Sequence, residues 1–269
     1  MITLAICMVL TSPLTISEPA VVDFDCGDSH GAVVVEPWRD AAIYLLADNI
    51  TLLNARTQGG QRAIRLDGDN ITIRRAVIAG CTKAGIDTPR TGTTGVVIED
   101  VEVSDCGNGV MMYTKDSATH VNLRIENIRC YRITGNVDGH CVGVQSISYS
   151  YIGHIFADTT QSDAVAVYWW NGTHCMIGNT VEHVTAFNTS WAVSMGGNNG
   201  DGQCRYDNTI RYVYGNVYLK GNRAPAGKNS LIAYGLYSEK IRLNGAGECW
   251  PDIGLHNIRG TILDDRKDC

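Results

Sequence analysis

Short apolar stretches that alternate with polar residues recur along the chain at intervals of roughly 25 to 30 residues. Each repeat has an alternating strand, often followed by an Asn or Asp, then a second short strand, a polar or glycine turn, and a third strand of the type G-V-x-M or A-V-x-V. Val, Ile and Thr dominate these stretches, which is typical of β structure. The repeats begin at Asp69, Thr94, His120, Tyr151, Asn179 and Asn208.

A fixed repeat of short strands indicates a solenoid. We therefore predict an all-β fold, a single-stranded right-handed parallel β-helix in which each repeat forms one coil. Coils would stack about 4.8 Å apart, with inward Val, Ile, Leu and Met forming ladders along the axis. The alternative is a β-sandwich, but a sandwich needs two-residue hairpin turns, of which the sequence offers few. Helical periodicity is almost absent, except for a short turn expected between Pro37 and Leu46.

The composition favours one domain that spans residues 1–269. Hydrophobic residues make up 44% of the chain, glycine is frequent (29) and proline is rare (6), and no segment has the composition of a linker. Ile2–Leu10 has the length of the apolar core of a signal peptide, but no Lys or Arg precedes Arg39. Residues 1–12 are therefore either a signal peptide or the first strand. No apolar run approaches the roughly 20 residues that a membrane-spanning helix needs.

The formal net charge of −6 argues against general binding of nucleic acid, because phosphate binding requires a basic surface. A local basic groove could still bind an acidic sugar chain. A polysaccharide is therefore the expected partner, with neither nucleic acid nor membrane. The sequence leaves the oligomeric state open.

The cysteines carry information through their register in the repeats. Cys81 and Cys106 lie one repeat apart, and Cys175 and Cys204 each precede an Asn-Thr by four residues. Neighbours in register on adjacent coils lie within the range of a disulfide, so we favour disulfides over free buried thiols. Disulfides predict an extracellular location or a virion surface. Zinc is not expected, since no C-x-x-C pair with partners occurs. The sequons at Asn49, Asn70, Asn171 and Asn188 add little, because Asn-Ile-Thr also suits strand chemistry.

Two neighbouring repeats bring together a candidate catalytic group. Aligning the apolar pair Val142 and Val144 with Val165 and Val167 places His140 beside Asp163, one coil further on. Asp138 lies two residues before His140, which predicts a separation of roughly 8 Å between the two carboxylates. Inverting glycosidases place their two carboxylates at about this distance, with a water molecule between them.

Two other interpretations of these residues stay open. In β-elimination from a uronic acid, His140 or Arg132 would take the C5 proton while a cation neutralises the sugar carboxylate. Alternatively, Asp138 and Asp163 are turn caps, because Asp and Asn bond nearby backbone N–H groups and N-V-D-G is good turn chemistry. Asp163 also shares strand parity with Val165 and would point inward unless the strand begins after it.

The stretch TQSDAVAVYWWNGTHC, residues 160–175, adds aromatic side chains next to these carboxylates. Tyr168 and Trp170 have the parity opposite to the apolar pair and should face outward, and Trp191 lies one coil on beside Asp163. Flat aromatic rings beside carboxylates suit sugar rings. The competing interpretation is a small apolar cluster under a loop. The candidate substrate-binding residues are Tyr113, Arg132, Tyr168, Trp170 and Trp191, and the candidate catalytic residues are Asp138, His140 and Asp163.

The coil pattern resembles the pectate-lyase-like superfamily of right-handed parallel β-helices. Within it, NVDGHCV with Asp138, QSDAVAV with Asp163 and SWAVSMGG with Trp191 resemble a degenerate form of the polygalacturonase motifs N-T-D, D-D and G-H-G. Ser162 replaces one aspartate of the pair, Trp191 replaces the histidine, and the family's R-I-K has no counterpart.

This resemblance implies an enzyme that cleaves an acidic polysaccharide, by hydrolysis ahead of elimination. No cofactor is expected, although the resemblance to lyases would imply Ca²⁺. The rival class is a non-catalytic, tailspike-like β-helix that binds glycan or forms a rigid stalk.

Overall fold

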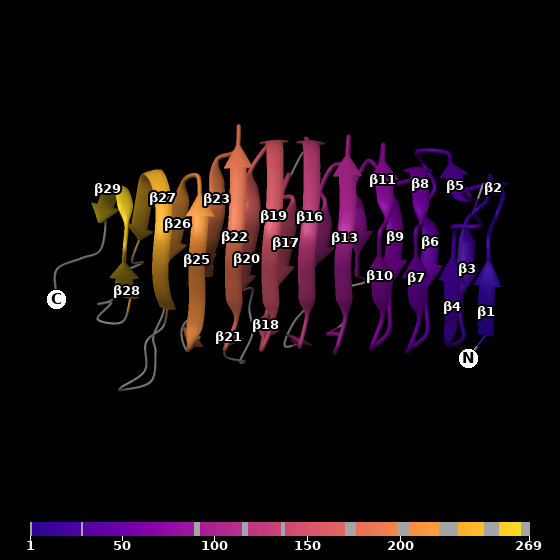
Figure 1. Cartoon of the computed structure of the whole chain (residues 1–269), viewed down its shortest axis with the longest axis horizontal. Coiled ribbons are helices and arrows are strands. Elements are labelled where there is room, and N and C mark those ends of the chain that lie inside the picture. The colour runs from indigo at the N-terminus through magenta and orange to yellow at the C-terminus, as the bar shows by residue number, and fades with distance from the viewer. Residues whose placement is uncertain are drawn as a thin grey trace.

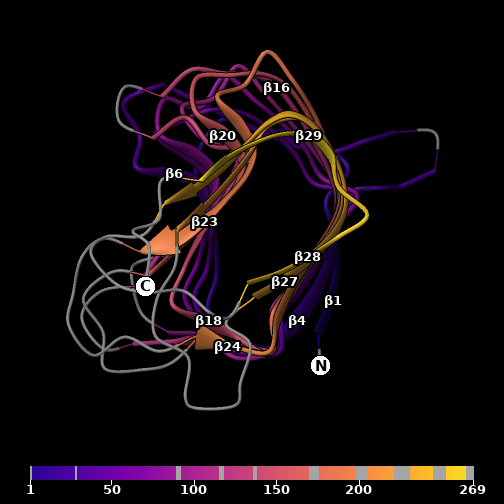
Figure 2. The same cartoon turned by 90° about the vertical axis from the view of Figure 1, so that its left-hand side faces the viewer.

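The strands stack side by side along one long axis from the N-terminal to the C-terminal end of the chain (Figure 1). The computed structural model describes residues 2–27, 29–88, 92–114, 118–135, 138–169, 176–197, 205–220, 231–244 and 253–264. The fold is all-β, a single-stranded right-handed parallel β-helix, as the repeat predicts. Seen along the axis, successive coils superpose (Figure 2).

Each coil contributes strands to three faces, and neighbouring strands on a face pair in parallel. The first face contains β1 (Ile2–Ala5), β4 (Ala20–Asp23), β7 (Thr51–Leu53), β10 (Thr72–Arg74), the first halves of β13 (Val97–Ser104), β16 (Arg124–Ile133), β19 (Tyr151–Thr160), β22 (Thr180–Phe187) and β25 (Asn208–Tyr214), the start of β27 (Leu231–Asn244), and β28 (Ile253–His256).

The second face begins with β2 (Val9–Leu10), β5 (Ala32–Val35), β8 (Arg56–Gly59) and β11 (Val77–Ala79), and continues through the second halves of the long strands to the start of β29 (Arg259–Asp264). The third face contains β3 (Leu14–Ile16), β6 (Ala41–Leu45), β9 (Arg62–Leu66), β12 (Ala84–Asp87), β14 (Val110–Met112), β17 (Val142–Gln145), β20 (Asp163–Trp169), β23 (Trp191–Gly197), β26 (Val217–Lys220) and the ends of β27 and β29. Two short pairs lie outside these faces, β15 (His120–Val121) with β18 (Ile147–Ser148) and β21 (Met176–Ile177) with β24 (Arg205–Tyr206).

The core consists of ladders of identical or similar apolar side chains. On the third face, Val110, Val142, Val165, Val193 and Val217 pair in succession and are all fully buried. Because a strand turns alternate side chains to opposite sides, the residues between them form an outward row. This outward row is Tyr44, Arg65, Asp87, Met111, Gly143, Ala166, Ser194, Tyr218 and Arg242.

Single residues with positive φ turn the chain at the corners between faces. Between the first and second faces these residues are Asn54, Arg75, Asp100, Asn127, His154, His183, Tyr212, Gly235 and Asn257. Asn, Asp and Gly tolerate this left-handed conformation best, which explains why several repeats carry one of them between the strands, although Arg75, His154, His183 and Tyr212 take this position in others. The sequon residues Asn49, Asn70 and Asn188 also have positive φ, so the left-handed conformation explains why asparagine occurs at these positions. Asn171 lies outside the described residues.

Buried polar side chains tie successive coils together near the start of β22 and β25. The Asn179 side-chain amide donates to the Ile147 carbonyl (3.0 Å) and to Asn208 Oδ1 (2.9 Å), while its oxygen accepts the Ser150 N–H (3.1 Å). Asn208 repeats the pattern by donating to the Met176 carbonyl (3.0 Å). The ladder satisfies backbone groups that the core would otherwise leave unpaired.

The structure corrects one expectation and confirms another. The short turn expected between Pro37 and Leu46 is confined to its start: the Arg39 N–H donates to the Glu36 carbonyl (3.0 Å) around Pro37 and Trp38. Ala41–Leu45 instead forms β6, because it pairs with strands on both sides. The predicted Cys81–Cys106 bridge is present, with 4.5 Å between the Cα atoms. Cys175 and Cys204 lie outside the described residues, and Cys7–Cys26 forms a further bridge. The described part contains no helix that could cross a membrane.

Candidate active site

The register of β17 and β20 places His140 beside Asp163, as the alignment of apolar pairs predicts. Val142 pairs with Val165 and Val144 with Val167. The Cys141 N–H donates to the Asp163 carbonyl (3.1 Å), and the Asp163 N–H donates to His140 Nδ1 (3.3 Å). Two neighbouring coils therefore present an imidazole and a carboxylate at the start of the third-face strands.

The Asp163 carboxylate is held by hydroxyl groups. Asp163 begins β20 and is 3% exposed. Its Oδ2 accepts hydrogen bonds from the Tyr168 hydroxyl (2.9 Å) and the Ser194 hydroxyl (2.5 Å), and it lies 3.7 Å from His140 Nδ1. Because Ser194 belongs to the outward row, the carboxylate reaches the outer side of the face and not the apolar core. The inward position expected from parity is avoided because Asp163 is the first residue of its strand.

His140 is a neutral hydrogen-bond acceptor in this cluster. The residue is 2% exposed, and burial lowers its pKa, against the opposing effect of Asp163 and then Asp138. Its Nδ1 accepts the Asp163 N–H, which assigns the proton of the neutral ring to Nε2. The backbone N–H of His140 donates to the Asn108 side chain (3.1 Å), which fixes the turn that carries it.

Tyr113 and Asp138 form a second phenol–carboxylate pair, closer to solvent. Both residues are half-buried and share a hydrogen bond. Burial raises the pKa of Tyr113, and the Asp138, Tyr168 and Asp163 charges raise it further. A Cβ atom on Gly143 would lie 2.7 Å from Met111 Sδ and 3.2 Å from the Tyr113 hydroxyl. The Tyr113 phenol therefore folds back over the space that the missing side chain leaves.

Tyr168 donates to Asp163, and the charges of Asp163 and Asp138 both act on it. Burial raises its pKa, and Asp163 raises it further. Its ring centroid lies 5.5 Å from that of His140, and it pairs in register with Gln145. Val144 pairs with Met112 on the neighbouring coil. The next residues along the two strands, Gln145 and Tyr113, are therefore neighbours as well. Gln145 and Ser194 therefore belong to the site, although no sequence signal beyond their outward parity pointed to them.

The other predicted residues are placed differently. Trp191 pairs with Asp163 as expected, and its ring packs on Tyr218 with 5.3 Å between centroids. Arg132 is 61% exposed at a corner between faces, where its guanidinium binds both oxygens of Asp105 (2.7 Å each). Trp170 lies outside the described residues.

A disulfide that the repeat does not predict fixes the edge of the site. Cys130 in β16 is bonded to Cys141, which lies between His140 and Val142. Both cysteines are fully buried, so the bridge anchors the turn that presents His140 to the core. Their separation of 11 residues is shorter than one coil, so an in-register search for cysteine pairs misses them.

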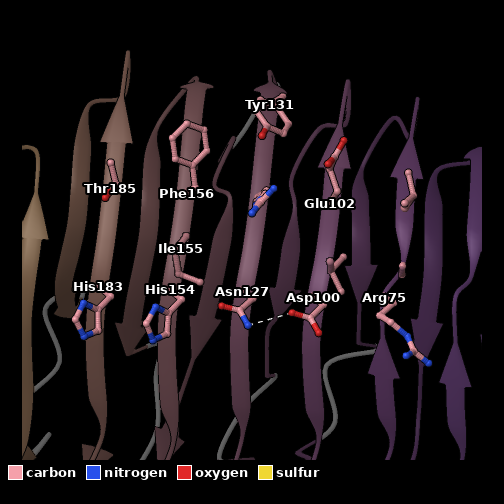
Figure 3. A pocket seen from close by; sticks show the side chains of 14 residues that line it. Arg75, Asp100, Glu102, Asn127, Tyr131, His154, Ile155, Phe156, His183 and Thr185 are labelled. Atoms are coloured by element: carbon pink, nitrogen blue, oxygen red, sulfur yellow. Dashed lines mark hydrogen bonds between the residues drawn. The ribbon is translucent and has the colours of Figure 1, made fainter.

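A separate groove of about 940 Å³ lies along the corner between the first and second faces. Figure 3 shows His154 and His183 side by side on adjacent strands, with Asn127 and Asp100 continuing the same row. The two imidazoles stack with 4.6 Å between centroids, and Asn127 donates to Asp100 (3.0 Å). Ring stacking and one hydrogen bond link these side chains along the axis, whereas the third-face cluster joins phenols, carboxylates and an imidazole at one point. The described residues include no group of three or more His, Cys, Asp or Glu side chains placed to hold a metal ion.

Comparison with known proteins supports the architecture. No family model matches the chain, and no curated protein matches it. Among solved structures, the chain is similar to an alginate lyase from Paenibacillus sp. str. FPU-7, with a TM-score of 0.56 and 12% sequence identity over 97% of this chain and 91% of that one. At this identity the likeness shows a shared β-helix fold and nothing finer.

Proposed function

We propose that the chain is a polysaccharide lyase that cleaves an acidic, uronic-acid-containing polysaccharide by β-elimination at the third-face cluster. The observation that carries this proposal is the unequal placement of the two carboxylates. Asp138 is half-buried and bonded to a phenol near solvent, whereas Asp163 is buried and occupied by two hydroxyl donors. The cluster thus offers one accessible carboxylate, Asp138, and its partner phenol, Tyr113, to a substrate.

This arrangement suits elimination better than hydrolysis. An inverting glycosidase needs one carboxyl group at the glycosidic oxygen and another at a water molecule on the opposite side of the sugar. Asp163 would have to leave Tyr168, Ser194 and its buried position to do either. Hydrolysis is retained as the second candidate because Asp138 and Asp163 come from neighbouring coils and both act on His140.

In the proposed reaction, Asp138 accepts the proton at C5 of the uronate. The electron pair of the C5–H bond forms the C4=C5 double bond, the C4–O bond breaks, and the Tyr113 hydroxyl gives its proton to the leaving oxygen. Protonated Asp138 then returns a proton to Tyr113 and restores both groups. The raised pKa of Tyr113 keeps the phenol protonated until the leaving oxygen develops charge.

The remaining residues position donors for the uronate carboxylate. A hydrogen-bonded or neutralised carboxylate stabilises the negative charge that develops when the C5 proton leaves. Gln145 lies beside Tyr168 on the outward side and provides an amide for this purpose, while the Tyr168 hydroxyl already donates to Asp163. Asp163, Ser194 and neutral His140 hold Tyr168 in place.

The structural neighbour supports this choice of substrate class, because alginate is a polymer of uronic acids and that protein is described as an alginate lyase. The three described disulfides fit an oxidising environment, so we place the protein outside the cytosol or on a virion surface. No step above uses a metal ion, so activity should survive chelation; its loss with EDTA and return with Ca²⁺ would restore the calcium-dependent alternative.

The decisive experiment incubates the protein with alginate, polygalacturonate and glycosaminoglycans and records two signals. Elimination produces an unsaturated sugar that absorbs in the far ultraviolet together with new reducing ends, whereas hydrolysis produces reducing ends alone. Tyr113→Phe and Asp138→Asn should each lower the elimination rate by about 100-fold or more. Tyr149→Phe, an exposed tyrosine elsewhere, is the control. Binding without either signal would favour the non-catalytic glycan-binding module.

A further inference from the structure

We infer that Trp191, Tyr218, Lys240 and Arg242 form a cationic aromatic subsite that binds the carboxylates of sugars beyond the cleavage point, towards the C-terminal coils. The inference rests on the proposed function, because it assigns the direction in which an acidic polymer lies on that site. These four residues are called the cationic subsite below.

The cationic subsite continues the candidate active site along the axis. Trp191 pairs with Asp163, so it lies one coil beyond the buried carboxylate. Tyr218 pairs with Ser194, and Arg242 pairs with Tyr218. The outward row therefore leads from Ser194, which holds Asp163, directly to an aromatic ring and then to a guanidinium.

Within the subsite, each cation lies over an aromatic ring. Lys240 Nζ is 5.4 Å from the centroid of Trp191, and Arg242 Cζ is 5.9 Å from that of Tyr218. The two rings are 5.3 Å apart, and all four side chains are half-buried. Rings of this kind stack on the C–H faces of sugars, while ammonium and guanidinium groups bind carboxylates. The combination matches a sugar that carries its own carboxylate.

The opposite end of the outward row lacks this character. Arg65 binds Asp40 (2.9 Å), and Arg62, on the same strand, binds both Asp40 and Asp87. These cations are neutralised by protein carboxylates, and no ring lies beneath them among the cation–ring contacts of the described residues. The N-terminal side of the row is therefore a poor match for the carboxylates of a polyuronate.

The spacing of the coils suits an extended sugar chain. Adjacent strands on a face lie about 4.8 Å apart, which is close to the length of one sugar unit in an extended polymer. A chain aligned with the axis would place successive sugars over Tyr218 and Arg242, the half-buried members of the row beyond buried Ser194. Polymers that reach the subsite should therefore bind more tightly than a disaccharide.

The test measures binding and turnover separately. Calorimetric titration of the Tyr113→Phe protein with alginate and polygalacturonate hexasaccharides should give a dissociation constant that rises about three- to fivefold for each of Lys240→Gln and Arg242→Gln. The matched control is Arg259→Gln, which removes the same charge from an arginine over Tyr237 on another face. Binding of a carboxyl-reduced hexasaccharide should be the same in all variants.

The outcomes separate the subsite from the proposed reaction. In the otherwise wild-type enzyme, the two substitutions should raise KM for the polymer and leave kcat within about twofold. Unchanged affinity in the double variant, with elimination intact, would overturn the subsite alone. If the wild-type protein shows no elimination but the substitutions at Lys240 and Arg242 still weaken hexasaccharide binding, the proposed reaction alone would be overturned. An equal effect of Arg259→Gln would mean that overall charge, not this subsite, is responsible.

Discussion

Gly143 shows how one missing side chain shapes the candidate site. The residue lies in the outward row between Met111 and Ala166, and the Tyr113 hydroxyl occupies the space above it. Its φ is not positive, so backbone conformation does not require glycine here. The requirement comes from the phenol, which can reach Asp138 only by crossing that space.

Gly143→Ala should therefore lower activity while leaving the fold intact. The added methyl group would press on Tyr113 and Met111, and we expect a fall in kcat of about tenfold or more from the displaced phenol. The check is to measure kcat on the polysaccharide that the screen of alginate, polygalacturonate and glycosaminoglycans identifies, together with the melting temperature of the variant. Gly254→Ala is the control, because its nearest contact is the flexible His256 side chain at 3.3 Å. Full activity in Gly143→Ala would remove Tyr113 from the mechanism.

His120 is a buried histidine outside the candidate site. It is fully buried, its Nδ1 accepts the Thr93 N–H (3.1 Å), and the Thr93 hydroxyl lies 2.8 Å from the same nitrogen. Burial lowers its pKa from 6.5 to about 4. The folded state therefore holds a neutral ring over a pH range in which the unfolded chain already binds a proton.

The stability of the protein should fall as the pH drops from about 6.5 towards about 4. Because the unfolded state binds more protons in this window, His120 alone should account for a loss of roughly 3 kcal/mol. His140 acts in the same direction. Denaturant titrations at several pH values measure how the free energy of unfolding depends on pH. This dependence should be weaker in His120→Gln, whereas the control His256→Gln, at an exposed position, should match the wild type. An identical dependence in His120→Gln would contradict the assignment.

For single residues, the sequence predicts which positions lie side by side better than it predicts what each side chain contacts. The neighbouring positions of His140 and Asp163 follow from aligning two apolar pairs, because core valines fix the register. The side-chain directions do not follow, since Asp163 begins its strand and turns outward to hydroxyls on two strands. The Tyr113–Asp138 pair joins residues from two coils near corners, where strand alternation gives no guidance.

At the scale of elements, the corners carry as much information as the strands. The Asn179–Asn208 ladder supplies donors and acceptors to three consecutive coils. Removing one rung leaves several backbone groups buried without partners, and each such group costs about 1–3 kcal/mol.

Asn179→Ala should lower the free energy of unfolding by about 3 kcal/mol or more. Chemical denaturation of the variant measures this loss. Asn188→Ala is the comparison, because Asn188 makes only an exposed hydrogen bond to Asp158 (3.0 Å) and has a positive φ. Its expected cost is about 1 kcal/mol. Equal losses in the two variants would show that the buried ladder contributes no more to stability than an exposed asparagine at a corner.

Strands were predictable wherever alternation was clean, as in Val97–Ser104 and Asp163–Trp169. The region from Pro37 to Leu46 misled because apolar residues at Ala41, Ala42 and Leu45 mimic a helical face. In the structure those residues are buried in β6 between β3 and β9. The strands that pair with this segment, which a local sequence pattern does not reveal, determine that it becomes a strand and not a helix.

For the whole molecule, the Cys81–Cys106 bridge joins two consecutive coils. It closes a loop of 25 residues, so its removal should cost about 3 kcal/mol through the added freedom of the unfolded chain. The Cys81→Ala/Cys106→Ala double variant, unfolded in denaturant beside the wild type, measures this. A loss below about 1 kcal/mol would mean that residual structure already restricts this part of the unfolded chain without the bridge.

The parallel pairing of each strand with the next coil has a consequence for how the chain folds. Val142 meets Val165, which is 23 residues away, and Val165 meets Val193, which is 28 residues away. Contact order is therefore set by the length of a coil and not by the length of the chain. All-β proteins usually fold slowly because their strands pair across most of the sequence. Here a longer solenoid would add contacts without adding distant ones, so an extra coil should leave the intrinsic rate of nucleation nearly unchanged.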